Sequence, residues 1–222
     1  KGNFTPQDVV NLAIAHPKHT RYICLKMWGY FTPHPCPPAT LRRMMLAYNR
    51  SKTQIRPVLQ IILTSPQLYA NLGEPDQVKP PLVYAAGLLR RTGQPVSEMS
   101  WRWLLDDMGQ VPFHPPNVNG WEQNEAWMST ASIRARYSAA SMVIENMNIK
   151  DGSIAKEQTP EQAIAAAIKT TGRPWYGVQT KAAMQRFARS SVEGMTNDWQ
   201  VEHFWPERQR VLRHFLLAGP DA

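Results

Sequence analysis

Apolar residues recur along most of this chain at intervals of three and four positions, the spacing of one face of an α-helix. The clearest stripes are Cys24, Met27, Trp28 and Phe31; Leu41, Met44, Met45 and Tyr48; Ile55, Val58, Leu59 and Ile62; Leu82, Ala85, Ala86 and Leu89; and Trp101, Leu104, Leu105 and Met108. The polar and apolar alternation of strands is almost absent. No repeat period links the stripes, so the sequence predicts an all-α, irregular multi-helix domain rather than a solenoid.

Prolines and hydroxyl residues mark the expected helix starts. Thr5 and Thr159 each precede a proline at the first helical position, and Gln162 completes a capping box after Thr159. Prolines 17, 66, 80 and 81 separate neighbouring helices, because the residue before a proline is pushed out of the α conformation. We expect helices at 5–16, 18–31, 39–50, 54–64, 81–92, 98–108, 130–147, 160–170, 179–190 and 207–217.

A polar stretch from Asn148 to Pro160, NIKDGSIAKEQTP, contains an Asp-Gly pair and reads as a loop or linker. We therefore expect two parts. Residues 1–150 form a helical domain, and residues 151–222 form a helical C-terminal extension packed on it.

The bulk composition narrows the class of protein. With 43% hydrophobic and 19% charged residues, the chain fits a packed domain, and no apolar run approaches the roughly 18 residues needed to span a bilayer. The net charge of +8 favours acidic partners, but Lys and Arg are scattered among Asp and Glu, which makes nucleic-acid binding unlikely. Two cysteines are too few for a disulfide framework, and Cys24, on an apolar stripe, is expected to be a buried thiol.

Residues 111–130, VPFHPPNVNGWEQNEAWMST, are too long and too unusual in composition for a simple helix connection. Two consecutive prolines hold the backbone extended, and an Asn-Gly pair marks a turn where a positive φ is cheap. Trp121 and Trp127 add two large amphipathic rings. Loops beyond about 12–15 residues are usually functional or disordered, and the aromatic residues argue against disorder. We expect a stiff Ω-like loop.

Two roles are open for this loop. In one, Trp121 and Trp127 wall a binding site by stacking on sugar rings or aromatic groups, while Asn117, Asn119 and His114 supply hydrogen bonds. In the other, both indoles fold inward as a plug between helix ends. The plug is favoured, because Trp and Pro in a long loop bury substantial area and the loop must be held down.

Catalytic candidates are few. His114, Glu122 and Glu125 form the only plausible acid/base cluster, although solvated loop carboxylates are the simpler interpretation. Ser129 and Thr130 precede a helix and read as caps rather than nucleophiles.

No cofactor or metal site is expected. The sequence contains no phosphate-binding glycine loop, no dinucleotide fingerprint, no H-E-x-x-H and no C-x-x-C. His16 and His19 are separated by Pro17, which breaks the geometry of a helical ligand pair, and no third ligand is near in sequence.

Three stretches resemble the C-terminal half of a bacterial family, the domain of unknown function 1800. They are HPKHTRYICLKMWGYF, VKPPLVYAAGLLRRTG around Gly87, and MGQVPFHPPNVNGWEQNEAWMSTAS. The third stretch carries the most specific set: Pro115, Pro116, Asn117, Gly120, Trp121 and Trp127. The resemblance covers most of residues 3–147 and thins out after Asn148. It departs at His114, where the family more often has asparagine, and the family's N-terminal half is absent from this chain.

The resemblance implies a cellular location but no chemical reaction. Members are generally exported and often encoded beside an exported protein of the alkaline-phosphatase superfamily, which implies a periplasmic or extracellular location. Expected partners are the protein's own N-terminal half, such an exported neighbour, or envelope polysaccharide. The first hypothesis is a binding or structural module that recognises an envelope polymer or partner protein. The alternative is a hydrolase of extracellular polysaccharide or another polymer, with a site shared with the missing N-terminal half.

Overall fold

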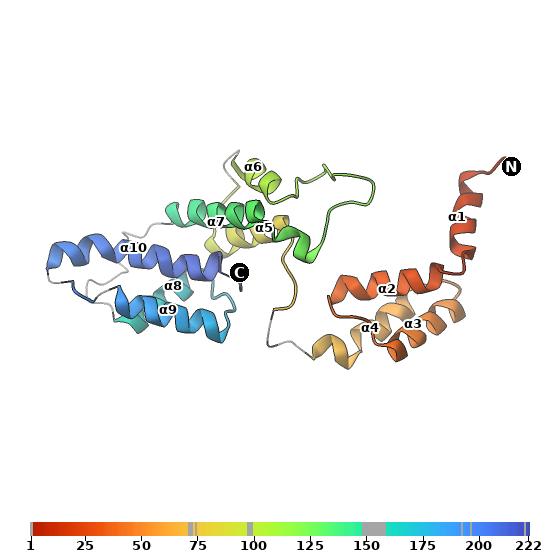
Figure 1. Ribbon diagram of the computed structural model, residues 1–222, viewed down its shortest axis with the longest axis horizontal. Coiled ribbons are helices and arrows are strands. Elements are labelled where there is room, and N and C mark those ends of the chain that lie inside the picture. Colours follow the sequence, from red (N-terminus) through yellow and green to blue (C-terminus); the bar gives the residue numbers. More distant parts are fainter. Residues whose placement is uncertain are drawn as a thin grey trace. The chain divides into compact units, whose positions relative to one another are not determined.

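Helices account for all regular structure in the part of the chain that the computed structural model describes, which confirms the all-α prediction (Figure 1). That part comprises residues 2–70, 73, 75–96, 100–147, 159–191, 193–195, 197–219 and 221–222. Within it, no helix has the length and apolar character needed to cross a membrane. The chain divides into two compact units, Lys1–Gln77 and Val78–Ala222.

The first unit contains four α-helices and a short 3-10 turn: α1 (Pro6–Ala15), α2 (His19–Phe31), α3 (Pro38–Arg50), α4 (Ile55–Leu63) and the turn Pro66–Tyr69. Helices α2, α3 and α4 enclose a core of Cys24, Trp28, Met44, Tyr48, Val58 and Ile62. Cys24 is fully buried, as its stripe predicted. Helix α1 has the expected Thr5 cap but buries none of its side chains.

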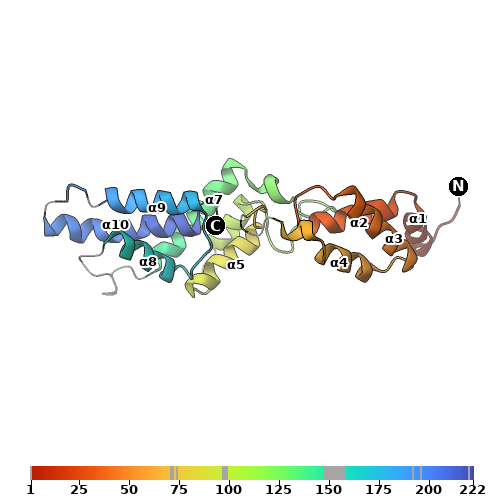
Figure 2. The same ribbon diagram turned by 90° about the horizontal axis from the view of Figure 1, so that it is seen from below.

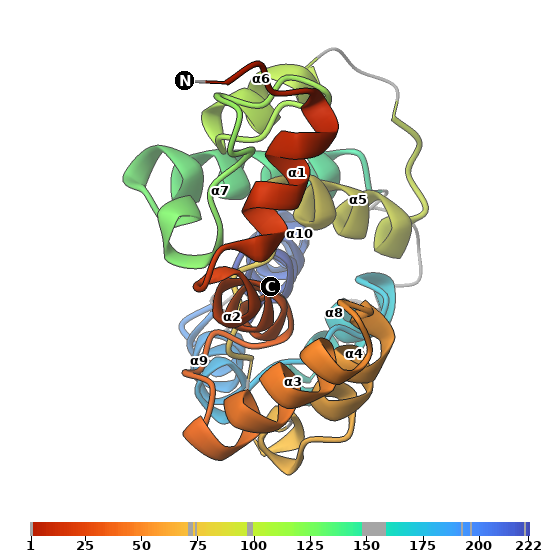
Figure 3. The ribbon, with the colours of Figure 1, turned by 90° about the vertical axis from the view of Figure 1, so that its right-hand side faces the viewer.

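The second unit holds the remaining helices: α5 (Pro81–Thr92), α6 (Ser100–Asp107), α7 (Thr130–Glu145), α8 (Pro160–Thr170), α9 (Val178–Ser190) and α10 (Asp198–Leu217). Helices α8, α9 and α10 run side by side (Figures 1 and 2), and α6 lies next to α7 with α5 beside them (Figure 3). Helix α10 joins these two groups. Its Leu212 and Leu216 pack with α8 and α9, whereas Leu217 packs with α5, α6 and α7.

The boundary expected near residue 150 lies inside this second unit. Most of the predicted linker, residues 148–158, lies outside the described residues, as do the first two positions of the helix expected at 98–108. The capping box of Thr159 and Gln162 is present, and the cap at Ser129 is present as well. These helix starts depend on neighbours three residues away, so the sequence predicts them well.

Two helix predictions were wrong in detail. Helix α10 begins at Asp198 rather than near residue 207. The Asn197 side chain caps this start by accepting a hydrogen bond from the backbone N of Gln200. Pro206, which was expected to precede the helix, lies inside it. Helix α5 turns a different face inward. Leu82 is exposed, while Tyr84 and Leu88 are buried with Ala85 and Leu89. Apolar residues flank the expected stripe on both sides, so the period alone does not select the buried face.

Candidate functional site

The segment between α6 and α7, residues 109–129, is called the tryptophan loop below (Figure 1). Its first residues are tied to two helices. The backbone N of Gln110 donates to the carbonyl of Leu105 at 2.8 Å, which closes the end of α6. The Gln110 side-chain oxygen accepts from the backbone N of Leu82 at 2.9 Å, in the first turn of α5. The start of the loop is therefore anchored.

The end of the loop is anchored by Trp127, the last residue of a short 3-10 turn, Asn124–Trp127. The Trp127 side chain is only 6% exposed. Its carbonyl accepts a hydrogen bond of 2.6 Å from the hydroxyl of Ser132, and the Ser129 hydroxyl caps α7 by accepting from the backbone N of Ser132. The Trp127 ring lies 4.0 Å from where a β-carbon on Gly109 would stand, so the two ends of the loop meet, as in an Ω loop.

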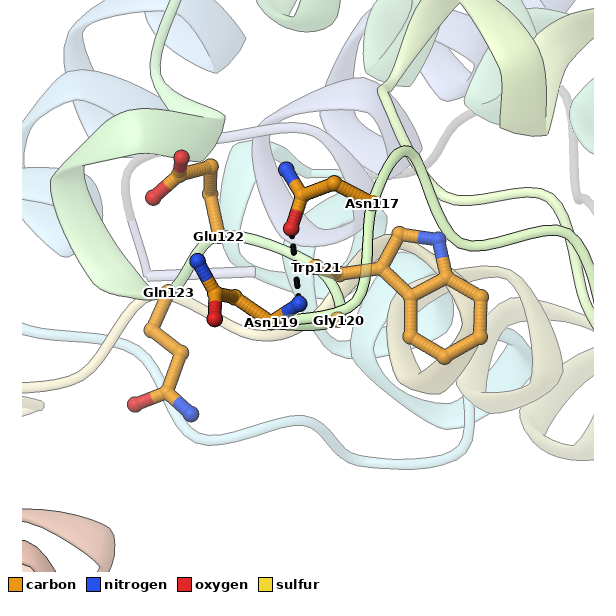
Figure 4. Close-up of a pocket in the computed structure, with 6 residues that line it drawn as sticks. All are labelled: Asn117, Asn119, Gly120, Trp121, Glu122 and Gln123. Carbon is orange, nitrogen blue, oxygen red and sulfur yellow. Dashed lines mark hydrogen bonds between the residues drawn. The ribbon is translucent and has the colours of Figure 1, made fainter. Parts of the chain in front are cut away.

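The middle of the loop is shaped by turn hydrogen bonds. The Asn117 side-chain oxygen accepts from the backbone N of Asn119 at 2.8 Å (dashed line in Figure 4), and the Asn117 carbonyl accepts from the backbone N of Gly120 at 3.1 Å. Gly120 has φ of +87°, a conformation that glycine adopts without steric cost. The predicted turn at the Asn-Gly pair is confirmed.

An open hollow of about 400 Å³ lies along this turn. Its lining residues are Asn117, Asn119, Gly120, Trp121, Glu122 and Gln123 (Figure 4). The half-buried indole of Trp121 lies on the other side of the segment from the Glu122 and Gln123 side chains (Figure 4). The hollow therefore combines amide groups, one carboxylate and one indole from residues 117 and 119–123 of a single loop.

The structure divides the seven residues proposed from the sequence. It brings Asn117, Asn119, Trp121 and Glu122 to the hollow, and it leaves His114, Glu125 and Trp127 out of the lining. Trp127 is buried, as the plug interpretation expects, whereas Trp121 is half-buried and lines the hollow, so the two indoles differ in burial.

The acid/base candidates are not joined to one another. His114, Glu122 and Glu125 are all exposed. Within the described residues no ion pair connects them. A search of the same residues for three or more His, Cys, Asp or Glu side chains placed to hold a metal ion found none.

Sequence reasoning missed two apolar side chains that the loop displays. Phe113 and Val118 are fully exposed, and Phe113 has φ of +63°, which is unusual for a bulky residue. Gln123, a third omission, lines the hollow. The sequence signal for Phe113 was its place between Pro112 and the pair Pro115-Pro116, and an aromatic residue is ordinarily expected to turn inward.

Comparison with known proteins is consistent with the earlier resemblance and extends it. A family profile described as "Protein of unknown function (DUF1800)" matches residues 1–221. The match passes beyond Asn148, where the resemblance was expected to thin out, and therefore includes α8, α9 and α10. Searches of curated proteins and of solved structures found no match. The chain belongs to the DUF1800 family.

Proposed function

We propose that this chain is a binding module, and that its tryptophan loop recognises a sugar-containing segment of an envelope polymer. One observation carries the proposal. The hollow gathers amide groups and an indole from residues 117–123 on a loop whose two ends are anchored. A partner protein is the other candidate ligand of the same hollow, and it becomes the preferred one if no glycan binds.

The groups at the hollow suit a polyhydroxyl ligand. The amides of Asn117, Asn119 and Gln123 carry both donors and acceptors, as sugar hydroxyls do. The oxygen of the Asn117 amide is held by the turn, which leaves its NH₂ group to donate to a ligand. The exposed part of the Trp121 indole offers a flat apolar face on which a sugar ring can stack. Because the turn is preformed, binding loses little conformational entropy.

Hydrolysis of an extracellular polysaccharide is the alternative proposal. Glycosidases use two carboxyl groups about 5–10 Å apart on either side of the scissile bond. Glu122 is the one acidic residue in the lining of the hollow, so a second acid or base would have to come from outside it. Binding requires no such addition, and we prefer it for that reason.

The proposed setting is the periplasm or the cell exterior, following from the family resemblance. The proposed partners are the protein's own N-terminal half, an exported protein of the alkaline-phosphatase superfamily and envelope polysaccharide.

A glycan array probed with the full chain tests the proposal, followed by calorimetry on the best ligand. We expect Trp121→Ala to weaken the Kd about tenfold or more, the effect of losing roughly 1.4 kcal/mol of stacking. Trp103→Ala is the matched control, because its indole is 66% exposed on α6 and outside the hollow. Absence of any bound glycan, or equal losses in both variants, would contradict the proposal. Release of reducing ends that Glu122→Gln abolishes would support the hydrolase instead.

A further inference from the structure

The imidazole of His214, in the last turn of α10, contacts α7 at a site that shares no residue with the hollow. It stacks on the ring of Tyr137, with 5.4 Å between the ring centroids and an angle of 15° between the planes. Its Nε2 lies 3.3 Å from the hydroxyl oxygen of Ser141, one turn further along α7. These two interactions are called the His214 contact below, and together they hold the end of α10 against α7.

The hydrogen bonds of Ser141 determine which ring nitrogen of His214 carries the proton. The Ser141 hydroxyl donates its single proton to the backbone carbonyl of Tyr137 at 3.0 Å, so its oxygen is left to accept from His214. The neutral imidazole consequently has its N–H at Nε2 and a lone pair at Nδ1. That Nδ1 is buried and has no hydrogen-bond partner among the residues that the structure describes. A proton added at Nδ1 would therefore have no acceptor.

The charged groups around His214 do not provide a close counter-ion. Glu145 on α7 is exposed, and no ion pair within the described residues joins His214 to a carboxylate. Arg210, one turn earlier on α10, and Arg213, next in sequence, are themselves cations. Burial lowers the pKa of His214, and the Glu145 carboxylate raises it by a smaller amount. The folded chain therefore favours the neutral imidazole.

We propose that the His214 contact is a pH-sensitive switch between α7 and α10: the two helices stay packed while the imidazole is neutral and loosen when Nδ1 takes up a proton from solvent. Three residues further on, the carbonyl of Leu217 accepts a hydrogen bond of 2.8 Å from the Tyr84 hydroxyl, and the Leu217 side chain packs with α5, α6 and α7. Protonation of His214 would therefore weaken the attachment of α10 to these three helices, while Leu212 keeps α10 on α8 and α9.

The direction of the pH effect follows from the lowered pKa of His214. In the unfolded chain the imidazole protonates near its ordinary pKa of about 6.5, which is a higher pH than in the folded chain. The stability that the His214 contact contributes is therefore complete above a pH of about 6.5, and it is lost as the pH falls from there through the folded-state pKa. Acid, rather than base, loosens the end of α10.

Hydrogen exchange of the full chain at about pH 8 and about pH 5, the range over which histidine titrates, tests the switch once the intrinsic pH dependence of exchange is corrected. We expect amides in the last turn of α10 to lose protection at the lower pH, whereas those of α4, in the other unit, keep theirs. His214→Phe keeps a ring that can stack on Tyr137 but has no nitrogen to protonate, so its last turn should be equally protected at both pH values. His114→Phe, at an exposed position of the tryptophan loop, is the matched control and should behave as wild type.

An NMR titration of the His214 imidazole in the wild-type chain needs no variant, so it tests the proposal even if His214→Phe does not fold. We expect a pKa below the ordinary value of about 6.5, with the proton of the neutral form at Nε2. A pKa at or above that value would overturn the proposal. So would unchanged protection in the last turn of wild-type α10 at the lower pH, an equal loss in wild type and His214→Phe, or an equal loss in α4.

Discussion

At its base the tryptophan loop is held by packing, with Trp127 buried against Gly109, whereas in its middle the same loop is held by turn hydrogen bonds beside open solvent. Trp121 and Trp127 are the same residue type, six positions apart, yet only Trp127 is buried. Residue type therefore does not decide burial within a loop. The contacts at the two ends of the loop hold residues 117–123 in place beside solvent.

Removing the buried indole of Trp127 at the base of the loop should have the largest effect on stability. Trp127→Ala should lower the free energy of unfolding by about 3–5 kcal/mol, because it removes a large buried side chain and leaves a cavity. Trp127→Phe should cost much less, since the buried indole N–H has no hydrogen-bond partner to lose among the residues that the structure describes. Urea denaturation measures both changes. A loss below 1 kcal/mol in Trp127→Ala would show that packing does not hold the base.

Ser132→Ala tests the hydrogen bond at the same end of the loop. Removing the hydroxyl leaves the carbonyl of Trp127 without its donor in a buried position, and we expect a loss of about 1–3 kcal/mol. Ser138→Ala, at an exposed position of the same helix, is the control and should be neutral or slightly stabilising. Equal unfolding midpoints for the two variants would contradict the prediction.

Trp121→Ala tests the same comparison at the less buried of the two indoles. Because its indole is half-buried, we expect a loss of about 1–2 kcal/mol in the free energy of unfolding, smaller than that of Trp127→Ala. The same urea titrations measure it. A loss equal to that of Trp127→Ala would mean that both indoles act as plugs, and the binding-wall interpretation of Trp121 would fall.

Gly120→Ala should have the smallest effect. At φ of +87° a β-carbon is strained, and we expect a loss of about 1 kcal/mol. Gly87→Ala in α5 is a matched control with the opposite sign, because within the described residues no atom outside the local helix backbone and the two chain neighbours lies within 4 Å of the added carbon, and alanine is the better helix former. Thermal melts of the two variants should move in opposite directions, and parallel shifts would argue against the turn geometry.

Local chemistry explains what could be predicted about the site. Asn117 and Gly120 form the expected turn because both hydrogen bonds of the turn, from the backbone N of Asn119 and of Gly120 to Asn117, join residues within the same four positions. The proposed cluster of His114, Glu122 and Glu125 is not joined by any ion pair, since adjacency in sequence does not force loop side chains to converge. The exposed Phe113 also escaped prediction, because its burial depends on whether another element covers it.

The sequence by itself determined the helical class, the caps at Thr5, Ser129 and Thr159, and the Asn-Gly turn, because each arises from residues within a few positions of one another. Only the tertiary structure decided that Trp127 would be buried while Trp121 stayed half-exposed. It also decided that Lys79 would meet Arg136, fifty-seven positions away. Burial and long-range hydrogen bonds depend on which distant segments become neighbours, and helical periodicity does not specify those neighbours.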